Sequence, residues 1–197
     1  MTTQEILEAA RAAKQAVALA SSRTRQSVLE RMADALRAPD SVEAILAANA
    51  EDMAAAKGHI SDVMLDRLAL TPERIGAMAK GILEVAALPD PVGAVLNRVE
   101  RPNGLVIEKT AVPMGVIAII YESRPNVTSD AAALAIKSGN ACILRCGKEA
   151  WRSASAIVTA LRRGVKQYAP MVEAATSTHY FYDDAQCKME DHILPRK

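Results

Sequence analysis

Two short apolar runs, each followed by a polar turn, constrain the fold of this chain most. The runs are VIAII (116–120) and ACILR (141–145), and an alanine-rich stretch separates them. Continuous β-branched runs of this kind are typical of strands that are buried on both faces of a parallel sheet. A connection of this length fits a right-handed strand–helix–strand crossover. The sequence therefore predicts an α/β fold with two adjacent parallel strands.

The polar turns YESRPN (121–126) and RCGKEA (145–150) follow these strands directly. Ligands of open α/β sheets bind outside the carboxyl ends of the strands, so we expect both turns to face one crevice. Each turn also leads into a helix, whose first N–H groups favour an anion. Arg145 and Lys148 add positive charge, and Gly147 permits close backbone approach. The pattern favours a phosphate-bearing ligand, and the alternative that both cations are solvated turn residues stays open.

Before residue 93 the apolar residues recur at helical spacing, and breakers and caps divide this part into several helices. A basic end with Gly58 is predicted to close one helix, and Thr71 with Pro72 to open another. Pro39 is predicted to break the chain, with Ser41 as a cap candidate for the next helix. In the crossover, Thr128 or Ser129 is the predicted helix cap.

From residue 93 the pattern changes to alternation around Pro102, Asn103 and Gly104, which predicts a β-hairpin. Two interpretations of this hairpin are open. It is either a local brace, which periodicity alone favours, or a protruding arm that pairs with a second subunit.

Composition argues against several classes of partner. The net charge of +1 gives no reason to expect nucleic acid, and no apolar run approaches the roughly 20 residues of a membrane helix. The N-terminus lacks the order of a signal peptide, so a cytoplasmic protein is expected. Three cysteines suit a reducing compartment better than a disulfide framework. From Tyr168 onward the composition differs from the rest of the chain.

The cysteines and the tail contain the remaining candidates for reactive or metal-binding groups. Cys142 lies in a predicted buried strand and is expected to fill the core. Cys146 is expected to be more exposed, with its pKa lowered by Arg145 and Lys148. The polar tail residues match no closed zinc pattern, so no metal site is predicted. These tail residues are His179, Asp183, Asp184, Cys187 and His192.

Several stretches resemble the gamma-glutamyl phosphate reductase (glutamate-5-semialdehyde dehydrogenase) family of the aldehyde dehydrogenase superfamily. They are ISDVMLDRLALTPERI (60–75), LPDPVG (88–93), residues 112–150, and ILAANAEDM in an N-terminal helix. The resemblance covers residues 1 to about 165 and implies a partial Rossmann-like fold. Its parts are a helical N-terminal segment, a hairpin that resembles an oligomerisation arm, the βαβ part of an NADP-binding domain, and a divergent tail: 1–92, 93–112, 113–165 and 166–197.

The resemblance also implies roles for the two turns. The family reduces gamma-glutamyl phosphate with NADPH in proline biosynthesis. The first turn is similar to a loop under the nicotinamide that contributes to the oxyanion environment, where Ser123 and Asn126 are both candidates. The second is similar to the loop that holds the adenosine ribose, and its two cations fit NADP better than NAD. Cys146 stands where the family has Gly and is expected to crowd the cofactor. The implied cofactor-binding residues are Tyr121, Glu122, Ser123, Arg124, Arg145, Gly147, Lys148 and Glu149.

The nucleophilic cysteine of the family lies downstream of everything matched here. We therefore expect a truncated reductase that is inactive alone. The alternative is a non-catalytic interaction or regulatory protein that pairs with a full-length reductase. An open apolar strand edge and the hairpin both predict a homo-oligomer or a larger assembly.

Overall fold

The computed structural model describes residues 3–165. Its first five elements are helices, as the periodicity predicts. Side chains cap three of them, because Ser21, Ser61 and Thr71 each accept a hydrogen bond from the backbone N–H three residues on. The helices are α1 (Thr3–Leu19), α2 (Ser22–Arg37), α3 (Pro39–Ala56), α4 (Asp62–Leu68) and α5 (Pro72–Ala87).

Two predicted helix starts are wrong. Helix α3 begins at Pro39, and Ser41 lies buried inside it. The crossover helix α6 (Pro125–Lys137) begins at its own proline, so Thr128 and Ser129 are interior residues. Proline is well suited to the first helical position because its missing N–H has no intrahelical partner there. In both places the proline starts the helix earlier in the chain than the sequence predicts.

The predicted strand–helix–strand unit is confirmed. Strands β3 (Val116–Ile120) and β4 (Ala141–Arg145) pair in parallel, and α6 connects them. β4 is buried, but β3 is not buried on both faces as predicted, because Ile120 is 73% exposed. Within residues 3–165, β4 is the only strand that pairs with β3, so the outer side of β3 has no neighbouring strand.

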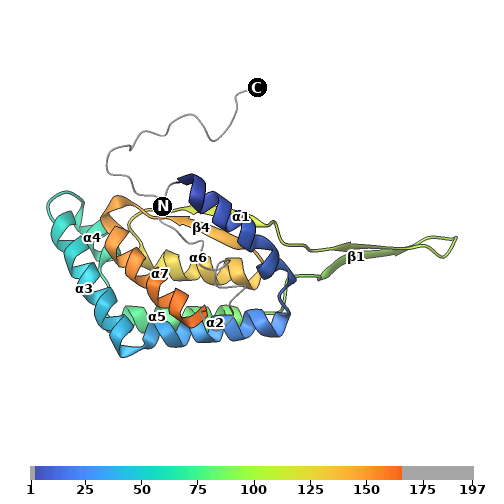
Figure 1. The fold of residues 1–197 in the computed structure, drawn as a ribbon, viewed down its shortest axis with the longest axis horizontal. Coiled ribbons are helices and arrows are strands. Elements are labelled where there is room, and N and C mark those ends of the chain that lie inside the picture. The colour runs from blue at the N-terminus through green and yellow to red at the C-terminus, as the bar shows by residue number, and fades with distance from the viewer. Residues whose placement is uncertain (1–2, 166–197) are drawn as a thin grey trace, which may run out of the picture.

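Helices cover the small sheet on both faces (Figure 1). On one face α1 packs Ile6 and Ala10 against Ile143 of β4. On the other face Cys142 and Leu144 join a core that they share with α6 and α7 (Trp151–Val165). Behind those two helices lie α2 and α5, whose buried residues complete the same core. The alternation of β4 side chains thus sends successive residues into two different layers.

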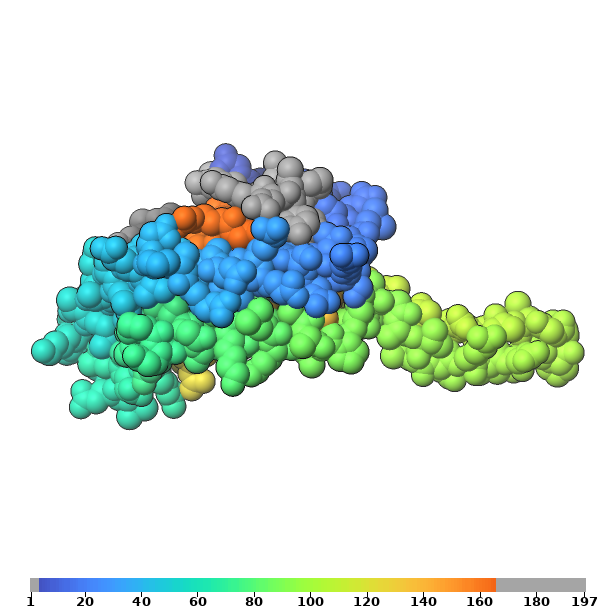
Figure 2. Space-filling view, turned by 90° about the horizontal axis from the view of Figure 1, so that it is seen from below, coloured from blue at the N-terminus to red at the C-terminus, as the bar shows by residue number. Residues whose placement is uncertain are grey.

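The predicted hairpin is confirmed and projects from this body (Figures 1 and 2). Strands β1 (Val95–Glu100) and β2 (Val106–Thr110) pair antiparallel, and every residue in them is exposed. In the turn, the Asn103 side-chain oxygen accepts from the Leu105 N–H at 3.2 Å, and Gly104 adopts a φ of +80°. The hairpin has too few contacts with the body to brace it.

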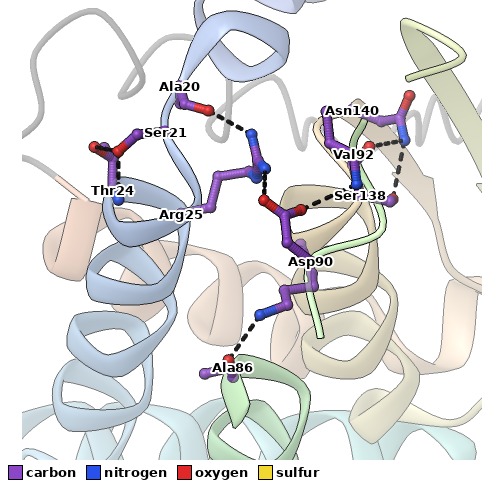
Figure 3. Close-up of polar contacts among 10 residues, drawn as sticks. Ala20, Ser21, Thr24, Arg25, Ala86, Asp90, Val92, Ser138 and Asn140 are labelled. Atoms are coloured by element: carbon purple, nitrogen blue, oxygen red, sulfur yellow. Dashed lines mark hydrogen bonds and ion pairs between the residues drawn. The ribbon is translucent and has the colours of Figure 1, made fainter. Parts of the chain in front are cut away.

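A partly buried ion pair lies at the root of the hairpin (Figure 3). The Arg25 side chain is 2% exposed, and it donates to an Asp90 carboxylate oxygen at 2.5 Å. Arg25 also donates to the Ala20 carbonyl, while the other Asp90 oxygen accepts from the Val92 N–H at 3.0 Å. Burial alone would raise the pKa of Asp90, but the Val92 N–H and Arg25 together hold that pKa below its usual value. The pair joins the α1–α2 turn to the segment that enters β1.

Helices α2 and α7 touch closely at a glycine. A Cβ at Gly164 would lie 2.5 Å from the Arg31 carbonyl oxygen and 2.8 Å from the Met32 Cα. We expect Gly164→Ala to lower the free energy of unfolding by about 1–3 kcal/mol, because the helices must separate. Gly76→Ala, in α5 with open space around it, should instead raise it by about 0.5–1 kcal/mol. Urea unfolding followed by circular dichroism checks both, and equal effects would contradict the close packing.

The ion pair predicts a pH-dependent effect of Asp90→Asn. At pH 7 the variant should lose about 1–3 kcal/mol of unfolding free energy, because a partly buried hydrogen bond between charged groups is lost. A lowered native pKa gives stability that is present above the unfolded pKa and lost as pH falls through the native one. The difference from the wild type should therefore shrink below about pH 4. Asp34→Asn, in an exposed pair with Arg37, is the control and should change stability by less than about 1 kcal/mol.

Candidate functional site

The two polar turns meet at the carboxyl end of the sheet. The Ser123 hydroxyl donates to a Glu149 carboxylate oxygen at 3.2 Å, and the Tyr121 N–H donates to the Arg145 carbonyl at 2.9 Å. A Cβ at Gly147 would lie 2.9 Å from that same Glu149 oxygen and 3.5 Å from the Ser123 nitrogen. Glycine at this position therefore lets the Glu149 side chain fold back onto the first turn. The structure brings the two turns together as the sequence predicts.

Each turn also leads into a helix. The first enters α6, and the second passes through a single 3-10 turn, η1 (Lys148–Ala150), into α7. Lys148 is exposed and Arg145 partly buried, and within residues 3–165 neither side chain forms an ion pair. The polar groups at this edge are thus the cations Arg145 and Lys148 and the carboxylate of Glu149, which already accepts a hydrogen bond from Ser123. This set fits a ligand that carries both a phosphate and hydroxyl groups.

The predicted oxyanion candidates differ in their surroundings. Ser123 is 4% exposed and its hydroxyl is engaged by Glu149. Asn126 is exposed on the first turn of α6, and its amide donates to Asp130 at 3.5 Å. Of the other predicted residues, Glu122 and Arg124 are exposed. The structure therefore leaves the Asn126 amide accessible and the Ser123 hydroxyl largely covered.

The prediction for Cys146 is wrong. Its side chain is 8% exposed and packs in a small cluster with Leu68 and alanines of α3 and α7. Burial raises the pKa of the thiol to about 12, and the nearby Asp52 and Glu149 outweigh Arg145. The thiol points into this cluster, so it does not crowd the exposed turn. The expected core role of Cys142 is confirmed, since it is 1% exposed and burial raises its pKa to about 12.

A buried polar network supports the second turn. Asp52 of α3 is 1% exposed and accepts from the Ser153 N–H and hydroxyl, both at 2.7 Å. A carboxylate at the N-terminus of α7 satisfies free N–H groups and favours the helix dipole. Asn49, one turn earlier in α3, donates a hydrogen bond to the Leu68 carbonyl at 2.9 Å and accepts one from the Leu70 N–H at 2.8 Å. The network ties the start of α7 to the α4–α5 connection.

Sequence reasoning missed a cavity of about 420 Å³ between α4, α5 and the start of α6. Arg124 and Asn126, from the end of the first turn, line it together with Asp130. Arg67 of α4 and Arg74 of α5 also line this cavity. These residues come from distant segments, so no local motif signals the cavity.

Among residues 3–165 no three His, Cys, Asp or Glu side chains group as metal ligands. The polar tail residues, for which the sequence predicts no metal site, lie outside the described residues. In the same part of the chain no helix combines the length and hydrophobicity that a membrane span requires.

Solved structures show the class of fold. A probable aldehyde dehydrogenase from Listeria monocytogenes superposes with a TM-score of 0.60 at 16% identity, over 90% of this chain and 36% of that chain. The described domain therefore has the fold of the aldehyde dehydrogenases. No family model matches the chain.

More similar proteins narrow the class. A gamma-glutamyl phosphate reductase of Streptococcus pneumoniae is 60% identical over 166 residues, which are 84% of this chain and 39% of that protein. The crystal structure of the Thermotoga maritima enzyme of this name is 37% identical with a TM-score of 0.80, over 90% of this chain and 42% of that chain. The Saccharomyces cerevisiae enzyme is 35% identical with a TM-score of 0.82, over 92% and 46%. Over the matched residues the chain is similar to gamma-glutamyl phosphate reductases, and it spans 39% of the length of that curated relative.

Proposed function

We propose that this chain forms part of the nucleotide-binding domain of a reductase that converts gamma-glutamyl phosphate to glutamate-5-semialdehyde in proline biosynthesis. The names of the relatives support the reaction. The observation that carries the nucleotide role is the contact between Ser123 and Glu149, which holds two strand-end turns together beside Arg145 and Lys148. Such a junction is where open α/β sheets bind ligands.

The cofactor we propose is NADP, whose reduced form NADPH would supply the hydride for the reduction. Lys148 and Arg145 would pair with its 2′-phosphate, because both are cations without an ion-pair partner in the described chain. Glu149 would accept from a ribose hydroxyl, and Gly147 lets the backbone approach. Residues of the first turn would line the nicotinamide end: Tyr121, Glu122, Ser123 and Arg124. The hydrogen bond from Ser123 positions the Glu149 carboxylate between the two regions.

For the oxyanion we propose Asn126 rather than Ser123. A donor must be free to point at the developing negative charge. The Asn126 amide is exposed at the start of α6 and makes only a long 3.5 Å hydrogen bond to Asp130, whereas the Ser123 hydroxyl is covered and donates to Glu149 at 3.2 Å. The N-terminal end of α6 would add its dipole at the same place.

Neither described cysteine suits the role of nucleophile. Acyl transfer in this family needs a thiolate, and a thiol with a pKa of about 12 is almost entirely protonated at neutral pH. Cys142 and Cys146 are also buried in separate clusters. We therefore propose that residues 3–165 contribute cofactor binding and do not supply the nucleophile.

Nucleotide titration tests the cofactor proposal. NADPH should bind about tenfold or more tightly than NADH, because a phosphate–cation hydrogen bond contributes roughly 1.5–3 kcal/mol. Lys148→Ala should remove most of this preference and leave NADH affinity almost unchanged. Lys109→Ala, which removes a charge from the projecting hairpin, is the matched control. Equal affinity of the wild type for both nucleotides would overturn the 2′-phosphate assignment.

We also propose that the hairpin pairs with a second copy of this chain. Val99 and Ile107 are cross-strand partners, and they are 39% and 45% exposed. Directly opposed residues share one face, so Val99 and Ile107 form an uncovered apolar patch on one face of the arm, beside the polar pair Asn97 and Lys109. An arm with such a face is typical of an assembly contact.

The assembly proposal predicts a mass above that of a monomer in size exclusion with light scattering. The double variant Val99→Lys with Ile107→Glu should shift the protein toward monomer, because it makes the apolar face charged and keeps an attractive cross-strand pair. Exchanging the charges of the existing Arg98–Glu108 pair on the other face is the control and should not change the mass. A wild-type monomer of uniform mass would contradict the proposal.

A further inference from the structure

The cavity between α4, α5 and the start of α6 has room for a small metabolite. Its volume of about 420 Å³ lies within the range of small-molecule sites. Side chains of both charges line it together with an apolar part, Leu70 and Met78. A cavity with opposite charges at its wall suits a ligand that itself carries both charges.

Asp130 is the group in this cavity that most needs a cation. It lies in α6, partly buried, and no ion pair within residues 3–165 includes it. Its neighbours supply only neutral hydrogen bonds, from the Asn126 amide at 3.5 Å and from Ser129. Burial raises the pKa of the carboxyl, which means that the charged form is poorly compensated. A ligand ammonium group would supply the missing positive charge.

The three arginines that line the cavity differ in whether they already have an ion-pair partner in the described chain. Arg74 is held by Asp66 at 2.9 Å and by the Ala69 carbonyl at 2.8 Å. Arg67 and Arg124 are exposed, and neither takes part in an ion pair within the described chain. Arg124 precedes α6, and Arg67 lies in α4. Two available guanidinium groups suit a carboxylate, which arginine binds through paired hydrogen bonds.

We propose that this cavity binds the zwitterionic α-amino-acid group of the substrate, with Asp130 on the ammonium and with Arg124 and Arg67 on the carboxylate. The inference deepens the proposed function and rests on it for the identity of the substrate. Asn126 also lines the cavity. A substrate held by its amino-acid end would therefore extend its reacting carbonyl along the wall that carries the proposed oxyanion donor.

Calorimetric titration of the 197-residue chain with L-glutamate, glutarate and 4-aminobutyrate tests this site. Glutarate lacks the ammonium group and 4-aminobutyrate lacks the α-carboxylate. L-Glutamate should bind about tenfold or more tightly than either, because each analogue leaves one charged partner unsatisfied. Equal binding of L-glutamate and glutarate, or no binding of L-glutamate to the folded chain, would overturn the proposal.

Two variants test which residue binds each charged group of the ligand. Asp130→Asn keeps the shape and should lower L-glutamate affinity about tenfold while leaving glutarate unchanged. Arg124→Gln, at an exposed position, should abolish the preference for L-glutamate over 4-aminobutyrate. Asp62→Asn at the exposed start of α4 and Arg101→Gln beside the hairpin turn are the charge-matched controls. An unchanged discrimination in both cavity variants would also overturn the proposal.

The nucleotide proposal and the amino-acid proposal can be rejected independently of each other. NADPH binding without L-glutamate binding would reject the amino-acid site and keep the nucleotide role. L-Glutamate binding with the predicted discrimination, in a chain that does not distinguish NADPH from NADH, would reject the 2′-phosphate role and keep the amino-acid site.

Discussion

Parallel pairing of β3 with β4 places both polar turns at one edge of the sheet, and the rest of the candidate site depends on that register. Ile120 is opposite Arg145, so the residues that follow each strand leave the sheet at the same level. Ser123 can then reach Glu149, and α6 and α7 start side by side. A slip of one residue would turn the side chains of β4 to opposite faces and separate Cys142 and Leu144 from the core they share with the helices.

The polar network around Asn49 and Asp52 connects this edge to the cavity. Asp52 holds the first N–H groups of α7, which follows the second turn directly. Asn49 holds the backbone on either side of Ala69, in the connection that also lines the cavity. Because both residues are buried and fully engaged, a change at either is expected to disturb the nucleotide turn and the amino-acid cavity together. Helix α3 therefore serves as a common support for the two proposed sites.

The hairpin and the body of the chain differ in structure and in proposed role. The body contains the shared core and both candidate sites, while the hairpin consists of exposed residues that contact little of it. The Arg25–Asp90 pair lies where the two parts join, and its lowered carboxylate pKa shows that the charged form is the stable one. The pair orients the chain before β1, so it positions the arm without touching its apolar face.

The sequence by itself determined the elements of this protein and the order in which they follow. Local rules suffice for a helix capped by Thr71, a hairpin at Asn103 and Gly104, and a parallel pair around an alanine-rich helix. Tertiary structure decided what each turn residue faces. Cys146 lies close to two cations in sequence, yet packing turns its thiol inward, where burial outweighs the charge of Arg145. The cavity that joins Arg67, Arg124 and Asp130 arises only when α4, α5 and the start of α6 come together, because no local pattern records the proximity of segments so far apart in the chain.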